Sequence, residues 1–132
     1  MNVVEKYLFS KIRIKNLKLD IEDADIRKEF DKKEELIQRY DEMLNFIKTY
    51  EAAFIKLKDI EKFLLQEIYY KETLTKELVF YYSNNFDELQ KLSVYLNRKI
   101  YKLTLANIRT IIYKSKKKAL EKLVLLMKNS CE

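Results

Sequence analysis

The sequence of 132 residues contains no glycine and no proline. Average usage would place roughly nine glycines and six or seven prolines in a chain of this length. Without glycine there is no phosphate-binding loop, no dinucleotide-binding fingerprint and no glycine-dependent hairpin turn. Charged residues make up 36% and hydrophobic residues 48% of the chain, and long helix-forming residues dominate. The composition therefore predicts an all-α protein with about five helices around a buried core.

Histidine is also absent, and Cys131 is the single cysteine. Histidine is the commonest general base and the commonest transition-metal ligand in proteins. Cys131 has no second cysteine to pair with, which predicts a free thiol in a reducing compartment. The five serines have no histidine to activate them, and none lies in a nucleophile-elbow motif. We therefore expect no enzymatic activity, no cofactor and no metal site.

No targeting or membrane-spanning segment is recognisable in the sequence. The N-terminal stretch MNVVEKYLFSKIRIK carries charges every few residues and lacks the apolar core of a signal peptide. Nowhere do eighteen apolar residues follow one another. The sequence thus predicts a cytoplasmic protein without a membrane partner.

The positive charge is concentrated in the last third of the chain. The formal net charge is +6, yet residues 1–83 hold 16 basic and 17 acidic residues, whereas residues 84–132 hold 11 basic and four acidic ones. Residues 97–118 contain eight basic residues and no acidic residue. A basic segment on a neutral body favours a polyanionic partner such as nucleic acid. A solvated, lysine-rich helix end is the alternative.

Two heptad stripes run through the first half of the chain. Apolar or small residues alternate at spacings of four and three along residues 2–24, and again within residues 32–70, which is typical of long helices that pair along one face. The stripes consist of Val3, Tyr7, Ser10, Ile14, Leu17, Ile21 and Ala24, and of Leu36, Tyr40, Met43, Ile47, Tyr50, Phe54 and Leu57. Asp31 is expected to cap the second helix. These helices pair either within one chain as a hairpin or between two chains in a homodimer through residues 2–70.

Capping residues predict three further helices in the second half. Thr75 is expected to cap a short helix, and Asn84 and Asn85 to form a turn with the left-handed backbone that glycine usually provides. Asn85 then caps the helix FDELQKLSVYLN, with Glu88 in the reciprocal position of a capping box. Thr104 caps the last helix. We therefore predict a pairing or dimerisation region at 1–72 and a helix-turn-helix DNA-binding region at 73–132.

The last helix is amphipathic. Its expected buried stripe is Leu105, Ile108, Ile112, Ser115, Ala119 and Leu123. A helix that reads the major groove needs small or polar side chains in its first turns and cations that reach phosphates. The candidate DNA-contacting residues are Thr104, Ala106, Asn107, Thr110 and Tyr113, together with the basic Arg98, Lys99, Lys102, Arg109, Lys114, Lys116 and Lys117.

Residues 107–123, NIRTIIYKSKKKALEKL, resemble the DNA-reading helix of sigma factor region 4. Asn107, Ile108, Arg109, Ser115 and Ala119 occupy the places of its small polar, β-branched core, basic and small residues. KELVFYY and FDELQKLSVYLN are similar to the two preceding helices of that unit, whereas the connector NRKIYKL is longer than its tight turn and lacks its glycine.

The layout of the whole chain is similar to small phage transcriptional regulators of the ArpU and RinA type. In these, a charged helical N-terminal half precedes one sigma-region-4-like unit. The resemblance implies an activator of phage or mobile-element late genes that binds double-stranded DNA and contacts RNA polymerase.

The residues alone leave a second class of function open. This is a non-enzymatic helical adaptor or inhibitor that binds a partner protein through its helices and its basic face. Lysines gathered on the outer face of residues 105–118 favour DNA, whereas lysines turned toward the N-terminal helices favour the adaptor.

Overall fold

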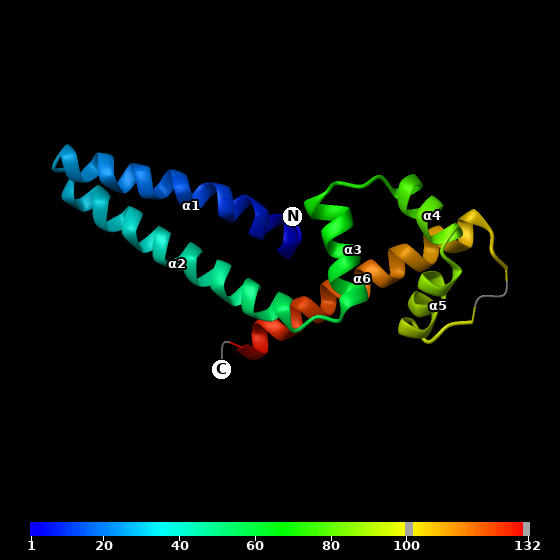
Figure 1. Ribbon diagram of the computed structural model, residues 1–132. Coiled ribbons are helices and arrows are strands. Elements are labelled where there is room, and N and C mark those ends of the chain that lie inside the picture. The colour runs from blue at the N-terminus through cyan, green and yellow to red at the C-terminus, as the bar shows by residue number, and fades with distance from the viewer. Residues whose placement is uncertain (100–101, 131–132) are drawn as a thin grey trace. The chain divides into compact units, whose positions relative to one another are not determined.

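The computed structural model describes residues 1–99 and 102–130 of the chain. These ranges form six α-helices and one π-helical turn and contain no strand (Figure 1). The all-α prediction is therefore confirmed. The chain divides into two compact units, one of residues 1–55 with the C-terminal residues from 127 onward, the other of residues 56–126. Cys131 lies outside the described residues.

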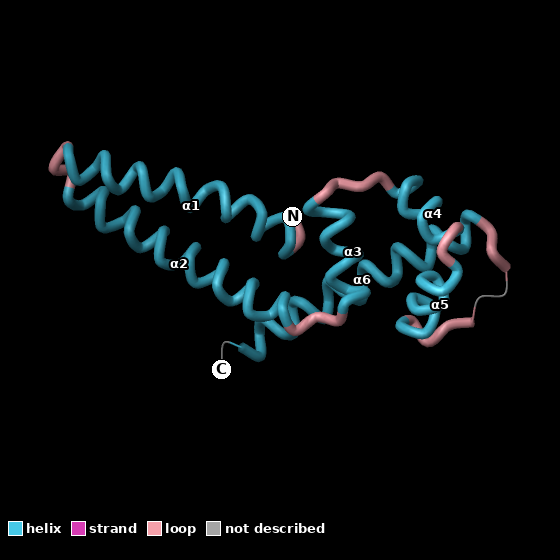
Figure 2. Tube along the Cα trace, viewed as in Figure 1, coloured by secondary structure: helices cyan, strands magenta, loops and turns pink. Residues whose placement is uncertain are grey.

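The first unit is an antiparallel helical hairpin. Helices α1 (Val3–Ile26) and α2 (Phe30–Ile55) lie side by side and are joined by the short turn 27–29 (Figures 1 and 2). The two heptad stripes face each other along the seam, where Leu17, Ala24 and Leu36 form a buried cluster. Nearer the open end, the rings of Tyr7 and Tyr50 stack with their centroids 3.9 Å apart. Of the two pairings open from the sequence, the one within a single chain is present.

The hairpin turn forms without glycine. Lys28 takes a left-handed backbone with a φ of 58°, and the amide of Glu29 donates to the carbonyl of Ala24 over 3.0 Å. The expected cap at Asp31 is wrong, because α2 already begins at Phe30 and Asp31 lies in its first turn. An ion pair of 2.6 Å between Lys33 and Asp25 connects the two helices beside the turn.

The second heptad segment is interrupted, and a continuous helix over residues 32–70 is therefore wrong. Helix α2 ends at Ile55, and α3 (Asp59–Leu65) begins after an extended backbone at Lys58 and continues into the π-helical turn η1 (Gln66–Tyr70). The side chain of Glu61 accepts a hydrogen bond of 2.7 Å from the backbone amide of Lys58 and so starts the new helix. The units divide after residue 55 instead of residue 72, and α3 and η1 belong to the second unit.

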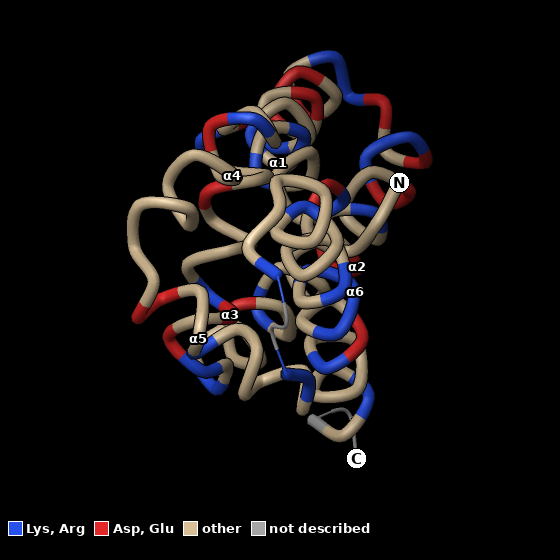
Figure 3. Tube along the Cα trace, turned by 90° about the vertical axis from the view of Figure 1, so that its right-hand side faces the viewer, with Lys and Arg blue, Asp and Glu red and all other residues tan. Residues whose placement is uncertain are grey.

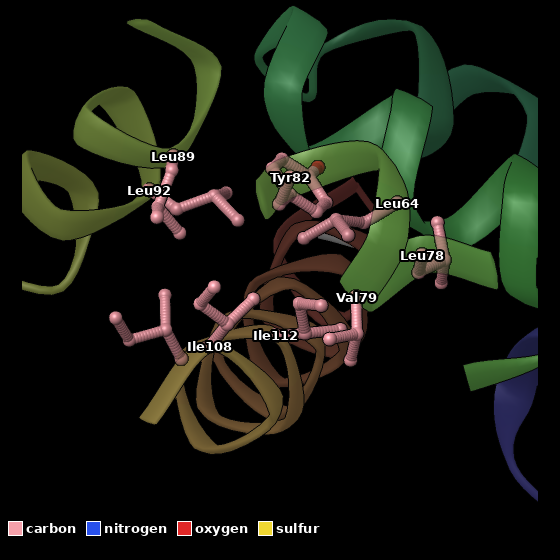
Figure 4. Close-up of a cluster of buried hydrophobic side chains, with 9 residues drawn as sticks. Leu64, Leu78, Val79, Tyr82, Leu89, Leu92, Ile108 and Ile112 are labelled. Carbon is pink, nitrogen blue, oxygen red and sulfur yellow. The ribbon is translucent and has the colours of Figure 1, made fainter. Parts of the chain in front are cut away.

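The second unit is built around one apolar core. Helices α3, α4 (Thr75–Ser83), α5 (Phe86–Tyr95) and α6 (Leu105–Ser130) all contribute to it. Figure 4 shows the core side chains of these four helices pointing toward one another. The core consists of Leu64, Leu78, Val79, Tyr82, Leu89, Leu92, Ile108, Ile111 and Ile112. This packing fixes which face of α6 is turned inward.

The helix ends in this unit differ from those expected. Helix α4 begins at Thr75, so Leu74 occupies the cap position. Neither asparagine of the following turn is left-handed, since Asn84 has a φ of −99° and Asn85 one of −131°. Their side-chain amides instead donate to the carbonyls of Phe80 and Tyr81, at 2.9 and 2.7 Å, and so end α4. Asn85 stands at the cap position of α5 but makes no side-chain capping bond there.

The left-handed residue in this part of the chain is Asn97, which follows α5. Its φ is 55°, and the amide of Arg98 donates to the carbonyl of Ser93 over 2.9 Å. Glu72 takes the same conformation after η1, with a φ of 54°. Left-handed backbone costs a residue with a Cβ about 1–2 kcal/mol, which is why glycine is usual at such helix ends.

Candidate nucleic-acid interface

The first turn of α6 is tied to the connector that precedes it. The hydroxyl oxygen of Thr104 accepts from the backbone amide of Asn107 over 3.1 Å, which confirms Thr104 as the helix cap. The side-chain amide of Asn107 in turn donates to the carbonyl of Lys102 over 3.0 Å. These two bonds hold the end of the basic connector against the start of the basic helix.

The inward face of α6 follows the expected stripe with one correction. Ile108, Ile112, Ser115, Ala119 and Leu123 are all buried. Leu105 was expected with them but is 63% exposed. The first residue of α6 in the core of the second unit is Ile108. Leu105, the first residue of the helix, lies beyond the end of this core and is therefore exposed. Ile111 is buried as well, which broadens the apolar face.

Most of the candidate DNA-contacting side chains lie on the solvent-exposed side. Figure 3 marks the basic segments of the chain in blue, and they recur along α6. The exposed candidates are Arg98, Lys99, Lys102, Thr104, Ala106, Asn107, Arg109, Thr110, Tyr113 and Lys117. Lys114 and Lys116 are half-buried, and the ammonium group of Lys116 lies 5.2 Å from the ring centroid of Tyr113. The face is thus cationic, accessible and free of acidic residues from 97 to 118.

The polar candidates at the start of α6 already bond to the backbone of α6 or of the connector before it. Thr104 and Asn107 do so as described above, and the hydroxyl of Thr110 donates to the carbonyl of Ala106 over 3.0 Å. An amide and a hydroxyl nevertheless retain acceptor capacity when one of their protons is engaged. Thr110, whose single hydroxyl proton is engaged, is therefore suited to accept from an exocyclic amine, whereas Asn107 keeps its amide oxygen as an acceptor and one N–H as a donor.

Lys118 and Lys122 of α6 take part in a polar network that the sequence did not reveal. Its centre is Glu61 of α3, whose side chain is fully buried. The carboxylate accepts from the Tyr95 hydroxyl at 2.5 Å and from the ammonium group of Lys122 at 3.0 Å. Lys118 donates to the backbone carbonyl of Tyr95 and lies 4.2 Å from the centroid of its ring. These contacts connect α3, α5 and α6.

The network keeps Glu61 ionised. Burial raises the pKa of its carboxyl, but hydrogen bonds from Tyr95, from the backbone of Lys58 and from Lys122 outweigh it and hold the pKa below its usual value. Burial and the bond to Glu61 raise the pKa of the Tyr95 hydroxyl. The only sequence signal was a pair of acidic residues, Asp59 and Glu61, where a helix N-terminus favours negative charge.

The same unit also contains an open groove between the start of α3 and α5. Its volume is about 490 Å³. Ile60, Val94 and Tyr95 give it an apolar surface, and Lys58, Asp59, Asp87 and Lys91 place charges of both signs around it. Val94 is 74% exposed. A groove of this kind suits an apolar side chain of a partner protein.

Across residues 1–99 and 102–130, no helix is both long and apolar enough to cross a membrane. The described residues also contain no group of three histidine, cysteine, aspartate or glutamate side chains that could hold a metal ion. Comparison with protein-family models, with curated proteins and with solved structures finds no match to this chain.

Proposed function

We propose that this protein is a sequence-specific DNA-binding transcriptional regulator that reads the major groove with residues 104–118. The observation that carries the proposal is the outer face of α6. Its first three turns expose small, polar and cationic side chains, while Ile108 and Ile112 anchor the opposite side in the core. Phage or mobile-element genes are the proposed targets, and RNA polymerase a second partner, because of the resemblance to small phage regulators.

In this proposal the side chains of the interface divide by task. Arg109, Lys114 and Lys117 neutralise phosphates, which gives affinity without regard to sequence. Asn107 and Thr110 contact base edges, where each good contact discriminates by about 1–3 kcal/mol. The connector adds Arg98, Lys99 and Lys102 on the exposed surface before α6.

The helix order α4, α5, α6 is compatible with a helix-turn-helix unit. Helices α4 and α5 are separated by two residues, and α5 and α6 by residues 96–104. The second connection is longer than the three or four residues of a usual helix-turn-helix turn. The angle at which α6 would enter the groove is therefore set by the core around Leu89, Leu92 and Ile108 instead of by a tight turn.

The test is a titration of alanine variants against a selected duplex and a random duplex at several salt concentrations. Replacing Arg109, Lys114 or Lys117 should weaken binding to both duplexes and flatten the slope of log affinity against log salt by roughly one unit. Replacing Asn107 or Thr110 should weaken binding to the selected duplex and leave the random duplex nearly unchanged.

Lys128 provides the matched control. It is an exposed lysine in the last turn of the same helix, outside the proposed interface, and its alanine variant should bind like the parent. Lys122 is unsuited as a control because it bonds to Glu61. If the variants of Arg109, Lys114 and Lys117 all bind DNA like the parent, the proposal is wrong.

The second candidate function is a helical adaptor or inhibitor that binds a partner protein. The apolar groove beside Ile60, Val94 and Tyr95 favours it, because a DNA-binding helix does not require such a surface. A Val94→Lys variant separates the two functions. It should leave DNA binding intact if α6 is the interface, and it should abolish binding to a protein partner that occupies the groove.

A further inference from the structure

The outer face of α1 carries an apolar stripe that the hairpin does not cover. Ile12, Leu19 and Ile26 follow one another at intervals of seven residues and are 68%, 62% and 80% exposed. They lie on the side of α1 opposite the seam, since Tyr7, Leu17 and Ala24 face α2. Single exposed apolar residues are ordinary, whereas a regular stripe of large ones marks an interaction surface.

Charge along α1 is arranged in two blocks. Residues 11–18 hold four basic residues and no acidic one, and residues 20–25 hold four acidic residues and no basic one. The basic block is Lys11, Arg13, Lys15 and Lys18, and the acidic block is Asp20, Glu22, Asp23 and Asp25. Leu19, the middle residue of the apolar stripe, stands at the boundary between them. The order of charges along α1 is therefore complementary to that of a second α1 helix in the antiparallel orientation.

We infer that two copies of this chain associate through the outer faces of their α1 helices, antiparallel and with Leu19 on the two-fold axis. In a two-fold interface, a contact between residue i of one copy and residue j of the other is repeated between residue j of the first copy and residue i of the second. Ile12 then packs on the partner's Ile26, and Leu19 on the partner's Leu19. Each basic block faces an acidic block, once at either end.

Lys15 and Glu22 are the charges best placed to specify this pairing. They are seven residues apart, so they lie on the same edge of the stripe, and antiparallel helices set like edges against each other. Both are exposed, and within the described residues neither forms an ion pair. Lys15 consequently meets the partner's Glu22, and Glu22 meets the partner's Lys15.

A parallel arrangement of the same surfaces is disfavoured. It would set the basic block against the basic block and the acidic against the acidic, which is repulsive at both ends. The seam stripes that suggested a homodimer from sequence do not compete for this role, because they are buried between α1 and α2 of one chain. The inference does not depend on DNA binding, and its test contains no DNA.

The test uses charge reversal and mutual rescue, followed by light scattering and sedimentation at low salt. The parent protein should approach twice its 16.1 kDa mass at tens of micromolar. Lys15→Glu alone, and Glu22→Lys alone, should each associate roughly tenfold more weakly or worse, because two attractive pairs per dimer become repulsive. An equimolar mixture of the two variants should recover association, and so should the double variant.

Rescue separates the inference from a folding defect, since a variant that fails to fold cannot be rescued by a second copy. Leu19→Lys should also abolish association, because two lysines would meet on the axis. Phe80→Lys, which changes a side chain 71% exposed on α4, is the control and should associate like the parent. A monomeric parent protein, or charge variants that associate like the parent, or lost association that neither the mixture nor the double variant recovers, would each overturn the inference.

Discussion

Replacing Glu61 tests whether the buried network holds the second unit together. In Glu61→Ala, the Tyr95 hydroxyl and the Lys58 amide lose their acceptor inside the protein, and Lys122 loses its ion-pair partner. Removing one member of a buried ion pair costs about 3–5 kcal/mol. Lys122 keeps 33% of its side chain exposed and can be hydrated when Glu61 is removed. The cost should therefore lie at the lower end of this range. We therefore expect a loss of about 3 kcal/mol in the free energy of unfolding.

The assay is urea unfolding followed by far-ultraviolet circular dichroism. Glu35→Ala is the matched control, because Glu35 also forms an ion pair, at 2.8 Å to Arg39, but on an exposed surface. An exposed pair of this kind is worth about 0.3–0.5 kcal/mol. If Glu61→Ala lowers stability no more than Glu35→Ala does, the reasoning about the network is refuted.

The isosteric variant Glu61→Gln adds a dependence on pH. The folded-state pKa of Glu61 lies below its usual value of 4.5, so the folded protein binds fewer protons there than the unfolded chain. The resulting stability is fully present above pH 4.5 and is lost as the pH falls through the folded-state pKa. The free energy of unfolding of the parent should therefore exceed that of Glu61→Gln most at neutral pH, and this difference should shrink below pH 4.5.

Three further substitutions should raise stability, as the same urea assay can check. Ser115 is fully buried, and its hydroxyl has no hydrogen-bond partner among the described residues. Ser115→Ala should therefore gain about 1 kcal/mol, and a loss would show that the hydroxyl has a partner. Glycine at the left-handed positions Lys28 and Asn97 should relieve backbone strain. The gain should be larger at Lys28, by up to about 1 kcal/mol, since asparagine tolerates this conformation better than lysine; an equal loss at both would contradict the strain argument.

The sequence predicted most of the fold where apolar spacing alone decides it. The stripes through Leu17 and Ile47 identified the seam of the hairpin, and Ile108 and Ala119 identified the inward face of α6. The break after Ile55 escaped prediction because Leu57 and Leu64 continue the apolar spacing across it. Periodicity cannot distinguish one long helix from two when the second begins in register.

The helix ends and the buried charges were harder to predict, because they depend on contacts between distant residues. The chain lacks glycine, and left-handed backbone falls on Lys28, Glu72 and Asn97. Asparagine tolerates this conformation, but no local rule selects Lys28 or Glu72, or prefers Asn97 to Asn84 and Asn85. Lys118 and Lys122 read as part of one lysine-rich helix in the sequence. Only the packing of α3 and α5 on α6 assigns Lys122 to Glu61 and Lys118 to Tyr95.

Because the heptad seam closes within one chain, a single copy buries its own long apolar stripes and needs no partner in order to fold. Assembly then becomes a reversible step governed by the amount of protein present. A surface as small as one face of α1 gives a weak complex that dissociates on dilution. Below the midpoint of association the paired form rises with the square of the total concentration. A response that required two copies would therefore switch on more sharply with expression level than one mediated by single molecules.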